Sequence, residues 1–444
     1  MNAMICMHSL PESHWTAVHG LGRLRRSAFL LLCLVVTLPA GFTSAQVDAT
    51  ARFALEKNTF VVGEPVFVVF SIRNSGRKIL AFAYRSPSRV LTPELEQEPA
   101  FAVTGRTGRR AFDPAPQPCG GAGGTVVYGS VTLPPGQTHT ERWLLNQWAR
   151  LDRPGNYMLR ARRRLPLHAF NPSTQKMSDK PSGYALALND LTFEMQAAIP
   201  GQVEAVLEQY VRQEEEQYSA DALLVLSTLP QPFLLDKFRK WVTTPRPPGY
   251  AARDRKALLE GLARLGSPAA WDVIAEVARG DTAPILPGGQ AGDALRSHAI
   301  LLLGEKREAR FVPVLLEILT GASESVRGET LRALGFFRHP QANEVLFENL
   351  RSPRASDRVN AVLGLRNLES REAIPALIGV LNDPDAQVRQ VANFALRGLT
   401  GEKFRLSLRA TPQESLRLAE LWRAWWREKG STFTPPRQAT CRDW

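Results

Sequence analysis

Hydrophobic positions recur with two different periods along the chain. From about Ala51 to Ala198 they alternate with the positions between them, a period of two that is typical of β-strands. The clearest run places four apolar side chains on one face of a predicted strand, Val66, Val68, Phe70 and Ile72. From about Ala220 onward apolar residues are spaced by three and four, which is typical of amphipathic α-helices. The pattern therefore predicts a β domain followed by a helical domain.

The alternating part contains several predicted strands separated by turns. After the turn at residues 74–76, the alternation resumes at Leu80, Phe82 and Tyr84. Further strands are predicted at residues 125–128, 141–145, 157–161 and 191–195. The turn at residues 133–136, with sequence Leu-Pro-Pro-Gly, separates two of these regions. Short strands and frequent turns of this kind predict a β-sandwich.

The helical part carries a repeat of 31 residues. An arginine returns at this spacing four times, at Arg296, Arg327, Arg358 and Arg389. A leucine follows each arginine after seven residues, so whole helical faces recur. The register extends upstream to Arg255, and the longer step of 41 residues between Arg255 and Arg296 is explained by a loop-forming insert at about residues 281–289.

Each repeat is predicted to form two helices. One helix pair cannot cover its own apolar stripe, so successive pairs must stack around a continuous core, which predicts an α-solenoid. Solenoids present a long concave surface for binding. We expect the second helix of each pair to form that surface, in the segments 312–319, 343–350 and 373–381.

The run from Pro384 to Leu396 carries a family resemblance. Its sequence Asp-Ala-Gln-Val-Arg-Gln-Val-Ala-Asn-Phe-Ala-Leu closely resembles the D-x-x-V-R-x-x-A-x-x-A-L core of short HEAT-like repeats, the type also found in phycobilin lyases. Other repeats depart from it: Ser323 replaces the aspartate of one, and Asp357 the valine of the next. The resemblance covers about half the chain, from near Ala220 to about Leu399, and it implies a protein-binding architecture without catalytic residues.

The resemblance also gives the repeated arginines a structural interpretation. In such repeats this arginine typically pairs with acidic or carbonyl groups of the adjacent repeat, and direct ligand binding is the alternative. The segments Gly63-Glu64-Pro65 and Leu151 to Tyr157 carry a second resemblance, to the strand-entry motifs of immunoglobulin-like domains in exported bacterial proteins. It implies an immunoglobulin-like sandwich in which Tyr157 hydrogen-bonds to the backbone upstream.

The two ends of the helical part have distinctive compositions. An acidic run at residues 213–217 predicts a solvated helix face at the first end. At the other end, six apolar residues form an amphipathic helix, Leu416, Leu418, Leu421, Trp422, Trp425 and Trp426. An end repeat must cover the apolar side of its neighbour, so we interpret this helix as a hydrophobic cap. The alternative is an aromatic platform for a sugar or a peptide.

An export signal is predicted before the β domain. Three arginines between positions 23 and 26 precede an apolar run at residues 28–38, and Ala45 ends a small-residue cleavage site. The apolar run is too short to span a bilayer, so no transmembrane anchor is expected in the mature chain. Met4 and Met7 are alternative starts. The expected organisation is a secretory signal peptide at 1–45, an immunoglobulin-like β-sandwich at 46–198, a HEAT-like α-solenoid with a capping helix at 199–430 and a C-terminal tail at 431–444.

The charge balance changes the choice of partner. The formal net charge is +12, and the signal removes three arginines and Glu12, a net of +2, which leaves +10. A basic exported protein is attracted to anionic polymers or membrane surfaces. Nucleic acid is disfavoured because export removes the protein from the cytoplasm. Two dense clusters are candidates for an anion-binding face, Arg106, Arg109 and Arg110 with Arg160, Arg162, Arg163 and Arg164; the alternative is that these arginines lie on the solvated side of a sheet.

Candidate chemistry is sparse. After signal removal the cysteines are Cys119 and Cys441, which form either a disulfide or two thiols, one of which could bond another molecule. The histidines lack metal-ligand spacing, and the glycine run at 120–124 lacks the lysine of a phosphate loop. We therefore predict no catalytic, cofactor-binding or metal-binding residue and no cofactor. A hydrolase that uses Cys119 is the enzymatic rival.

Together these features predict a non-enzymatic binding scaffold, exported to the periplasm or the cell exterior. It would use the concave face of the solenoid to bind a protein partner in the cell envelope. The alternative is a module that binds acidic polysaccharide through the arginine clusters and tryptophans.

Overall fold

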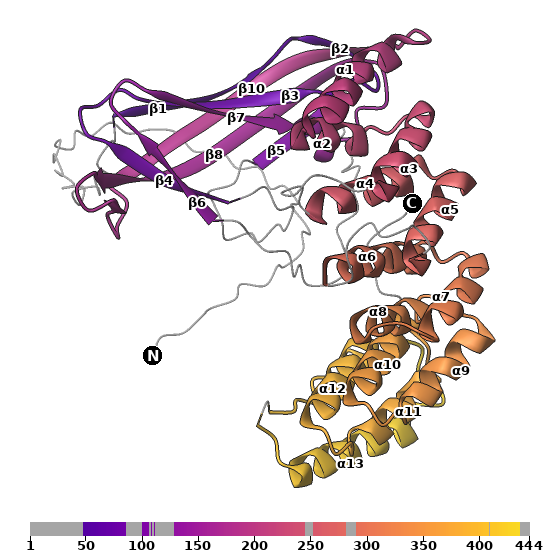
Figure 1. Ribbon diagram of the computed structural model, residues 1–444. Coiled ribbons are helices and arrows are strands. Elements are labelled where there is room, and N and C mark those ends of the chain that lie inside the picture. The colour runs from indigo at the N-terminus through magenta and orange to yellow at the C-terminus, as the bar shows by residue number, and fades with distance from the viewer. Residues whose placement is uncertain are drawn as a thin grey trace, which may run out of the picture. The chain divides into compact units, whose positions relative to one another are not determined.

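A computed structural model describes residues 48–85, 100–105, 108, 111, 128–244, 252–280, 290–407 and 409–435 (Figure 1). Strands fill the first part of these residues and helices fill the second, as the two hydrophobic periods predict. The last strand ends at Gln196 and the first α-helix begins at Gln202. No described helix has the length and apolar character that crossing a membrane requires.

The described strands form two sheets. The strands are β1 (Ala49–Leu55), β2 (Thr59–Val61), β3 (Phe67–Asn74), β4 (Leu80–Arg85), β5 (Ala100–Gly105), β6 (Tyr128–Leu133), β7 (Thr138–Leu144), β8 (Gly155–Asn171), β9 (Lys176–Met177) and β10 (Gly183–Gln196). The smaller sheet has the order β1-β3-β7. The larger sheet has the order β2-β10-β8-β4-β6, and β5 and β9 also pair with β8. Strands β2 and β10 run parallel, and the other described pairs run antiparallel.

The two sheets share one hydrophobic core. Phe70 and Ile72 of β3 are buried with Leu159 of β8 and Phe193 of β10. These positions follow the predicted alternation, so the hydrophobic pattern sets which face of each strand is buried. Tyr157 lies at the start of β8, and its hydroxyl donates a 2.9 Å hydrogen bond to the carbonyl oxygen of Arg153. This confirms the predicted bond from Tyr157 to upstream backbone. Burial raises the pKa of Tyr157.

Some strand lengths differ from the predicted ones. The strands expected at 157–161 and 191–195 lie near the start of β8 and at the end of β10, which have 17 and 14 residues. The strand expected at 125–128 has described residues only from Tyr128, and β6 continues to Leu133. The length of β8 escaped prediction because a charged residue, Arg163, interrupts its apolar face.

Helices fill the rest of the described chain. They are α1 (Gln202–Gln217), α2 (Ala220–Thr228), α3 (Leu235–Thr243), α4 (Ala252–Leu265), α5 (Pro268–Arg279), α6 (Gln290–Lys306), α7 (Val312–Leu319), α8 (Glu324–Leu334), α9 (Pro340–Asn349), α10 (Ala355–Asn367), α11 (Ala373–Val380), α12 (Ala386–Thr400) and α13 (Pro412–Lys429). Short 3-10 helices are η1 (Leu145–Gln147), η2 (Pro232–Leu234) and η3 (Ala309–Phe311).

The repeat motif works through its capping residue. Asp385 is the N-cap of α12, and its side chain accepts hydrogen bonds from the backbone N–H groups of Gln387 and Val388. Ser323, which replaces the aspartate in an earlier repeat, caps α8 in the same way by accepting from Val326. The substitution therefore keeps the capping function.

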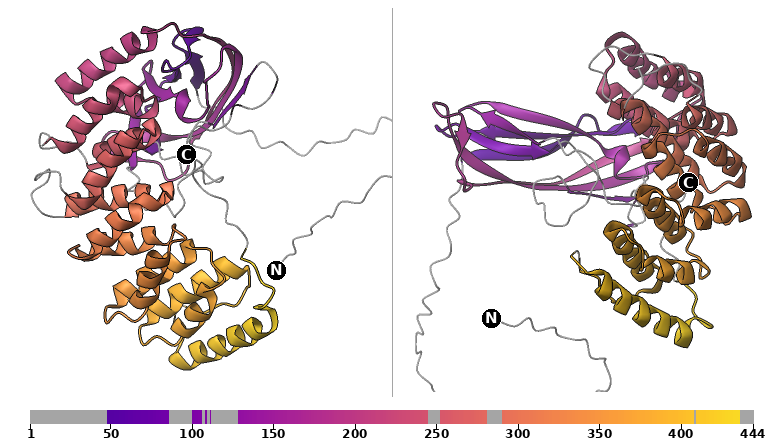
Figure 2. Two further views of the ribbon diagram at one scale, coloured as in Figure 1. Left: turned by 90° about the vertical axis from the view of Figure 1, so that its right-hand side faces the viewer. Right: turned by 60° about the horizontal axis from the view of Figure 1, so that its bottom comes forward.

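The helices from α4 onward form two layers (Figures 1 and 2). In one layer α4, α6, α8, α10 and α12 contact one another in turn. Glycine permits this close approach. Gly335 is the C-cap of α8, and a Cβ atom added to it would clash with the carbonyl oxygen of Gly364 on α10, at 2.0 Å. In the other layer α7, α9 and α11 approach one another less closely. The segments expected to form the concave face, 312–319, 343–350 and 373–381, correspond to α7, α9 and α11 and so lie in this more widely spaced layer.

The ends of the helical part correct two details of the sequence analysis. Glu214, in the acidic run, is buried, so that run is not wholly solvated. At the other end Leu418, Trp422 and Trp425 of α13 are buried against the helical core, as a cap requires. Leu416 and Leu421 are exposed, which contradicts their inclusion in the apolar face.

Candidate functional site

The repeated arginines connect neighbouring segments of the helical part. Arg327 of α8 donates from Nε to both carboxylate oxygens of Asp357 on α10, at 3.1 Å each. Arg358 donates to Asp383 through Nε at 2.7 Å and through Nη2 at 2.8 Å. These bonds also explain a departure from the repeat motif, since Asp357 occupies the valine position and accepts the preceding repeat's arginine.

The other two repeated arginines, Arg296 and Arg389, donate hydrogen bonds to neutral groups. Arg296 donates to the carbonyl oxygens of Ala278 and Arg279, at the end of α5. Arg389 donates to the Ser415 hydroxyl on α13 at 3.1 Å and to the carbonyl oxygen of Asp383. All four guanidinium groups are therefore engaged within the chain.

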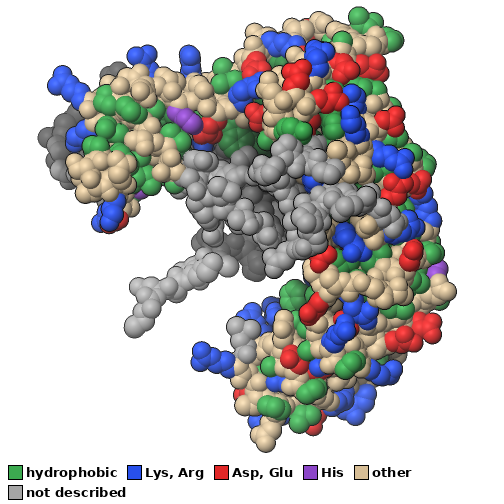
Figure 3. Space-filling model, in the orientation of Figure 1, with side chains coloured by type: hydrophobic (Ala, Val, Ile, Leu, Met, Phe, Trp, Pro, Cys, Tyr) green, Lys and Arg blue, Asp and Glu red, His purple; other side chains and the backbone are tan. Residues whose placement is uncertain are grey.

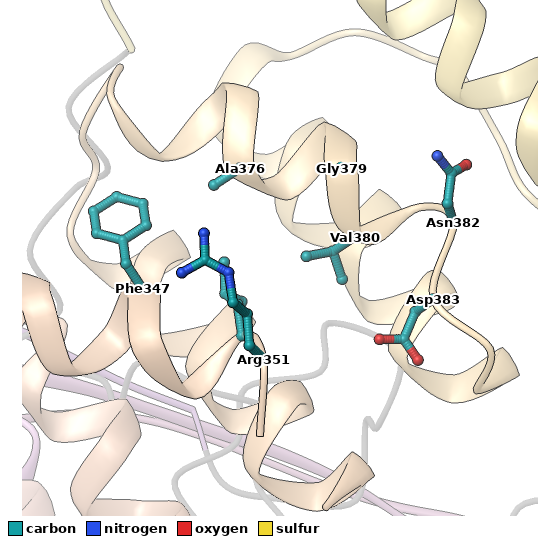
Figure 4. Close-up of a pocket in the computed structure, with 8 residues that line it drawn as sticks. Phe347, Arg351, Ala376, Gly379, Val380, Asn382 and Asp383 are labelled. Carbon is teal, nitrogen blue, oxygen red and sulfur yellow. The ribbon is translucent and has the colours of Figure 1, made fainter. Parts of the chain in front are cut away.

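A groove lies between α9 and α11 (Figure 4). It encloses a volume of about 310 Å³. Its lining residues are Phe347, Leu350, Arg351, Ala376, Gly379, Val380, Asn382 and Asp383. The apolar residues line its walls, and the Arg351 side chain points into the space between the two helices (Figure 4). The groove exists because α9 and α11 belong to the widely spaced layer.

The charges at the rim of the groove are unequal. Asp383 holds the bidentate pair with Arg358, and this hydrogen bond raises the pKa of the arginine. Arg351 is exposed and makes no ion pair with a described residue. The charge available to a ligand is therefore the positive charge of Arg351. A ligand that combines an apolar side chain with a carboxylate complements these walls and this cation.

Gly379 opens the groove. It is exposed, and a Cβ atom added there would meet no atom within 4 Å. At the equivalent positions one and two repeats earlier the chain has Glu348 and Glu317. The loss of this side chain in one repeat leaves the space that the groove occupies. The sequence analysis did not single out Arg351 or Gly379, although the break in the 31-residue register is a signal that could have found Gly379.

The structure divides the predicted anion-binding arginines of β8 between two faces of the strand. Arg106, Arg109 and Arg110 lie outside the described residues. Arg160 pairs with Asp190 at 2.9 Å, and Arg162 and Arg164 are exposed on the same face of β8. Arg163 lies on the opposite face, buried, and donates a 2.7 Å hydrogen bond to Glu141. A single convergent cluster is therefore wrong for the residues of β8, because neighbouring strand residues point to opposite faces.

One histidine of the helical part lies beside a carboxylate. His298 of α6 lies 3.0 Å from the Glu260 carboxylate of α4. Burial raises the pKa of the nearby Glu329 on α8, although the Arg332 and His298 charges oppose the shift. In the described ranges no three His, Cys, Asp or Glu side chains gather as a metal site would require. Cys119 and Cys441 lie outside the described residues. On the face in Figure 3, acidic and basic side chains are interspersed over the helical part.

Comparison with known proteins supports the helical repeats. Residues 290–359 match the model of HEAT repeats, and residues 357–383 match that of the PBS lyase HEAT-like repeat. This confirms the predicted HEAT-like character for residues 290–383. No curated protein matches the chain.

Three solved structures are similar at low scores. A protein described by "AvmM Catalyzes Macrocyclization in Alchivemycin A Biosynthesis" is 15% identical, with a TM-score of 0.15, over 35% of this chain and 93% of that one. The sporulation control protein Spo0M from Bacillus subtilis is 14% identical, with a TM-score of 0.16, over 38% of this chain and 56% of that one. A mutant Salmonella alpha-2-macroglobulin is 14% identical, with a TM-score of 0.17, over 84% of this chain and 27% of that one.

Proposed function

We propose that the protein is a non-enzymatic, exported binding scaffold, in which an immunoglobulin-like β-sandwich precedes a HEAT-like α-solenoid. Its partner is a protein of the cell envelope. The groove between α9 and α11 is the observation that carries this proposal. The matches to HEAT repeats also support it, because stacked helix pairs present surface for protein contact.

The groove selects the chemistry of the partner. Phe347, Leu350 and Val380 form a wall for an apolar side chain, and burial of such a side chain supplies most of the binding free energy at a hot spot. Arg351 supplies a cation at the same place, where the planar guanidinium can donate two parallel hydrogen bonds to a carboxylate. The partner segment therefore carries an acidic residue beside an apolar one.

The tryptophans do not support a polysaccharide site. Trp422 and Trp425 are buried in the helical core. Trp422 donates to the Asn393 side-chain oxygen at 3.2 Å, and Trp425 donates to Glu402 at 2.7 Å. An aromatic platform for a sugar needs an exposed ring face, which these two side chains lack.

A bulky side chain at position 379 tests this function. Gly379→Trp places an indole where the structure leaves open space, so it fills the groove without backbone strain. We expect affinity for the partner to fall by about tenfold or more, because a hot spot is then occluded. The measurement is quantitative capture of envelope proteins on immobilised wild-type and variant chains, followed by titration of the proteins that differ.

Matched variants separate occlusion from general damage. Gly321→Trp adds the same indole at another glycine with no neighbouring atom within 4 Å, and it should leave capture unchanged. Arg351→Glu should weaken binding, whereas Arg338→Glu, at an exposed arginine away from the groove, should not. Equal capture by wild type and Gly379→Trp would overturn the proposed site.

A further inference from the structure

Strand β10 presents a row of large apolar side chains to solvent. Tyr184, Leu186 and Leu188 point to the same face and are 41%, 66% and 61% exposed. Alternate residues of a strand are roughly 7 Å apart, so the three side chains form a straight line along one strand. Leu186 and Leu188 are among the most exposed large hydrophobic side chains of the described residues.

The core fixes this orientation. Phe193 and Met195 are buried from β10, so the other residues of the same parity also point inward. Ala187 therefore faces the core opposite Arg163, its neighbour on β8, and its small side chain leaves room for that buried arginine. The leucines are exposed as a consequence of this register, and a slip of one residue would bury them only by exposing Phe193.

Cations lie directly beside the apolar row. Arg164 pairs in register with Leu186, and Arg162 pairs with Leu188. The Arg164 guanidinium stacks 3.9 Å from the centre of the Tyr184 ring. Arg162 is exposed and makes no ion pair with a described residue. Farther along the same face Arg160 is paired with Asp190, so Arg162 places a cation without a described ion pair next to Leu188.

We infer that the outward face of β8 and β10 is a peripheral membrane-binding surface for anionic lipid. Arg162 and Arg164 bind lipid phosphate groups, and Leu186 and Leu188 enter the boundary between headgroups and acyl chains. Tyr184 lies at the interface, where an amphipathic ring is favoured. This surface belongs to the β part and is independent of the groove between α9 and α11.

The chemistry of the face disfavours other occupants. Acidic polysaccharide would satisfy the arginines, but aliphatic side chains gain little from contact with hydroxyl groups. A stable protein interface covers roughly 800 Å² on each partner, whereas this row has three apolar side chains and two cations. A second copy of the chain would bring more arginines to a face on which Asp190 is already paired with Arg160. A lipid surface needs only a few inserted side chains together with adjacent cations.

Vesicle binding tests this inference. The purified protein is sedimented with vesicles of phosphatidylcholine alone and of phosphatidylcholine mixed with phosphatidylglycerol. We expect binding to the mixed vesicles and little binding to the neutral ones. Leu186→Thr with Leu188→Thr, which introduces β-branched residues that suit a strand, should weaken binding by about tenfold or more. Arg162→Gln with Arg164→Gln should weaken it by about tenfold or more and reduce its salt dependence.

Insertion has its own readout and control. In the Leu188→Trp variant, the fluorescence of the introduced indole should be quenched by lipids that carry bromine in their acyl chains. Leu416→Gln with Leu421→Gln changes two exposed leucines of α13 and should leave binding unchanged. The inference is overturned if mixed vesicles bind no protein, if the two leucine pairs have equal effects, or if Leu188→Trp is not quenched. It is also overturned if the face instead mediates self-association that Leu186→Thr with Leu188→Thr abolishes.

Discussion

Replacing Arg163 by leucine is expected to cost about 3–5 kcal/mol of the free energy of unfolding of the β part. The Arg163 side chain is 4% exposed, and its guanidinium lies over the Phe70 ring and donates to Glu141. Glu141 is on β7 and Arg163 is on β8, so the pair joins the two sheets. Removing the arginine leaves a carboxylate that is only 17% exposed without its main counter-charge. Thermal and denaturant unfolding, followed by near-ultraviolet circular dichroism, measure the loss.

The adjacent arginine is the matched control. Arg162→Leu changes an exposed residue of the same strand and should alter stability by no more than about 0.5 kcal/mol. The double variant with Arg163→Leu and Glu141→Leu should recover most of the loss, because it removes both charges of the pair. Equal stabilities for Arg162→Leu and Arg163→Leu would show that the pair contributes nothing.

The stability lost in Arg163→Leu should also depend on pH. Burial raises the pKa of Glu141, but hydrogen bonding and charge from His139 and Arg163 outweigh it and hold the pKa below the usual 4.5. A carboxyl group with a lowered folded pKa contributes stability above its unfolded pKa, and this contribution is lost as pH falls through the folded value. Without Arg163, protonation relieves the buried charge. The stability difference between wild type and Arg163→Leu should therefore shrink as pH falls below about 4.5.

Replacing Trp422 by alanine is expected to cost about 3–5 kcal/mol in the last repeats. The side chain is fully buried, its ring centre lies 4.8 Å from that of Phe404, and its indole N–H donates to Asn393 on α12. The variant loses this packing and leaves the Asn393 oxygen without its donor. Because each repeat contacts only its neighbours, the loss should concentrate in α12 and α13. Hydrogen exchange resolved along the chain measures it.

Two comparisons make the Trp422 result specific. Leu421→Ala changes the adjacent exposed residue of α13 and should have little effect on exchange. Exchange in β8 and β10 should be the same in Trp422→Ala as in wild type. Faster exchange spread evenly over strands and helices would contradict the view that α13 caps the repeats.

Much of the fold follows from periodicity. The alternation around Phe70 and Ile72 predicts the buried face of β3, and the 31-residue spacing predicts the stacked helices, because both periods record burial directly. The motif around Asp385 and Arg389 predicts a capped helix that connects to its neighbour. The hydrogen bonds of the repeated arginines join neighbouring repeats, so they can be anticipated from the 31-residue spacing.

The remaining features depend on contacts between distant residues. From the sequence alone Arg163 is expected at the surface. Its burial is tolerable only because Glu141 on β7 pairs with it. Ala187 and Leu188 illustrate the opposite case: the larger side chain is exposed because Phe193 and Met195 decide the parity of β10. The groove requires the spacing of α9 and α11, which depends on how closely the opposite layer packs. Single-strand or single-helix patterns carry none of this information.

Site-specific photo-crosslinking tests the central claim that the groove between α9 and α11 holds a protein partner. A benzophenone side chain at Asn382, on the rim of the groove, should crosslink to one envelope protein through an acidic segment. The crosslink should disappear when Gly379→Trp is added, and the same probe at Leu421 should give no crosslink to that protein. Crosslinks that are equal at Asn382 and Leu421, or that persist with Gly379→Trp, would contradict the claim.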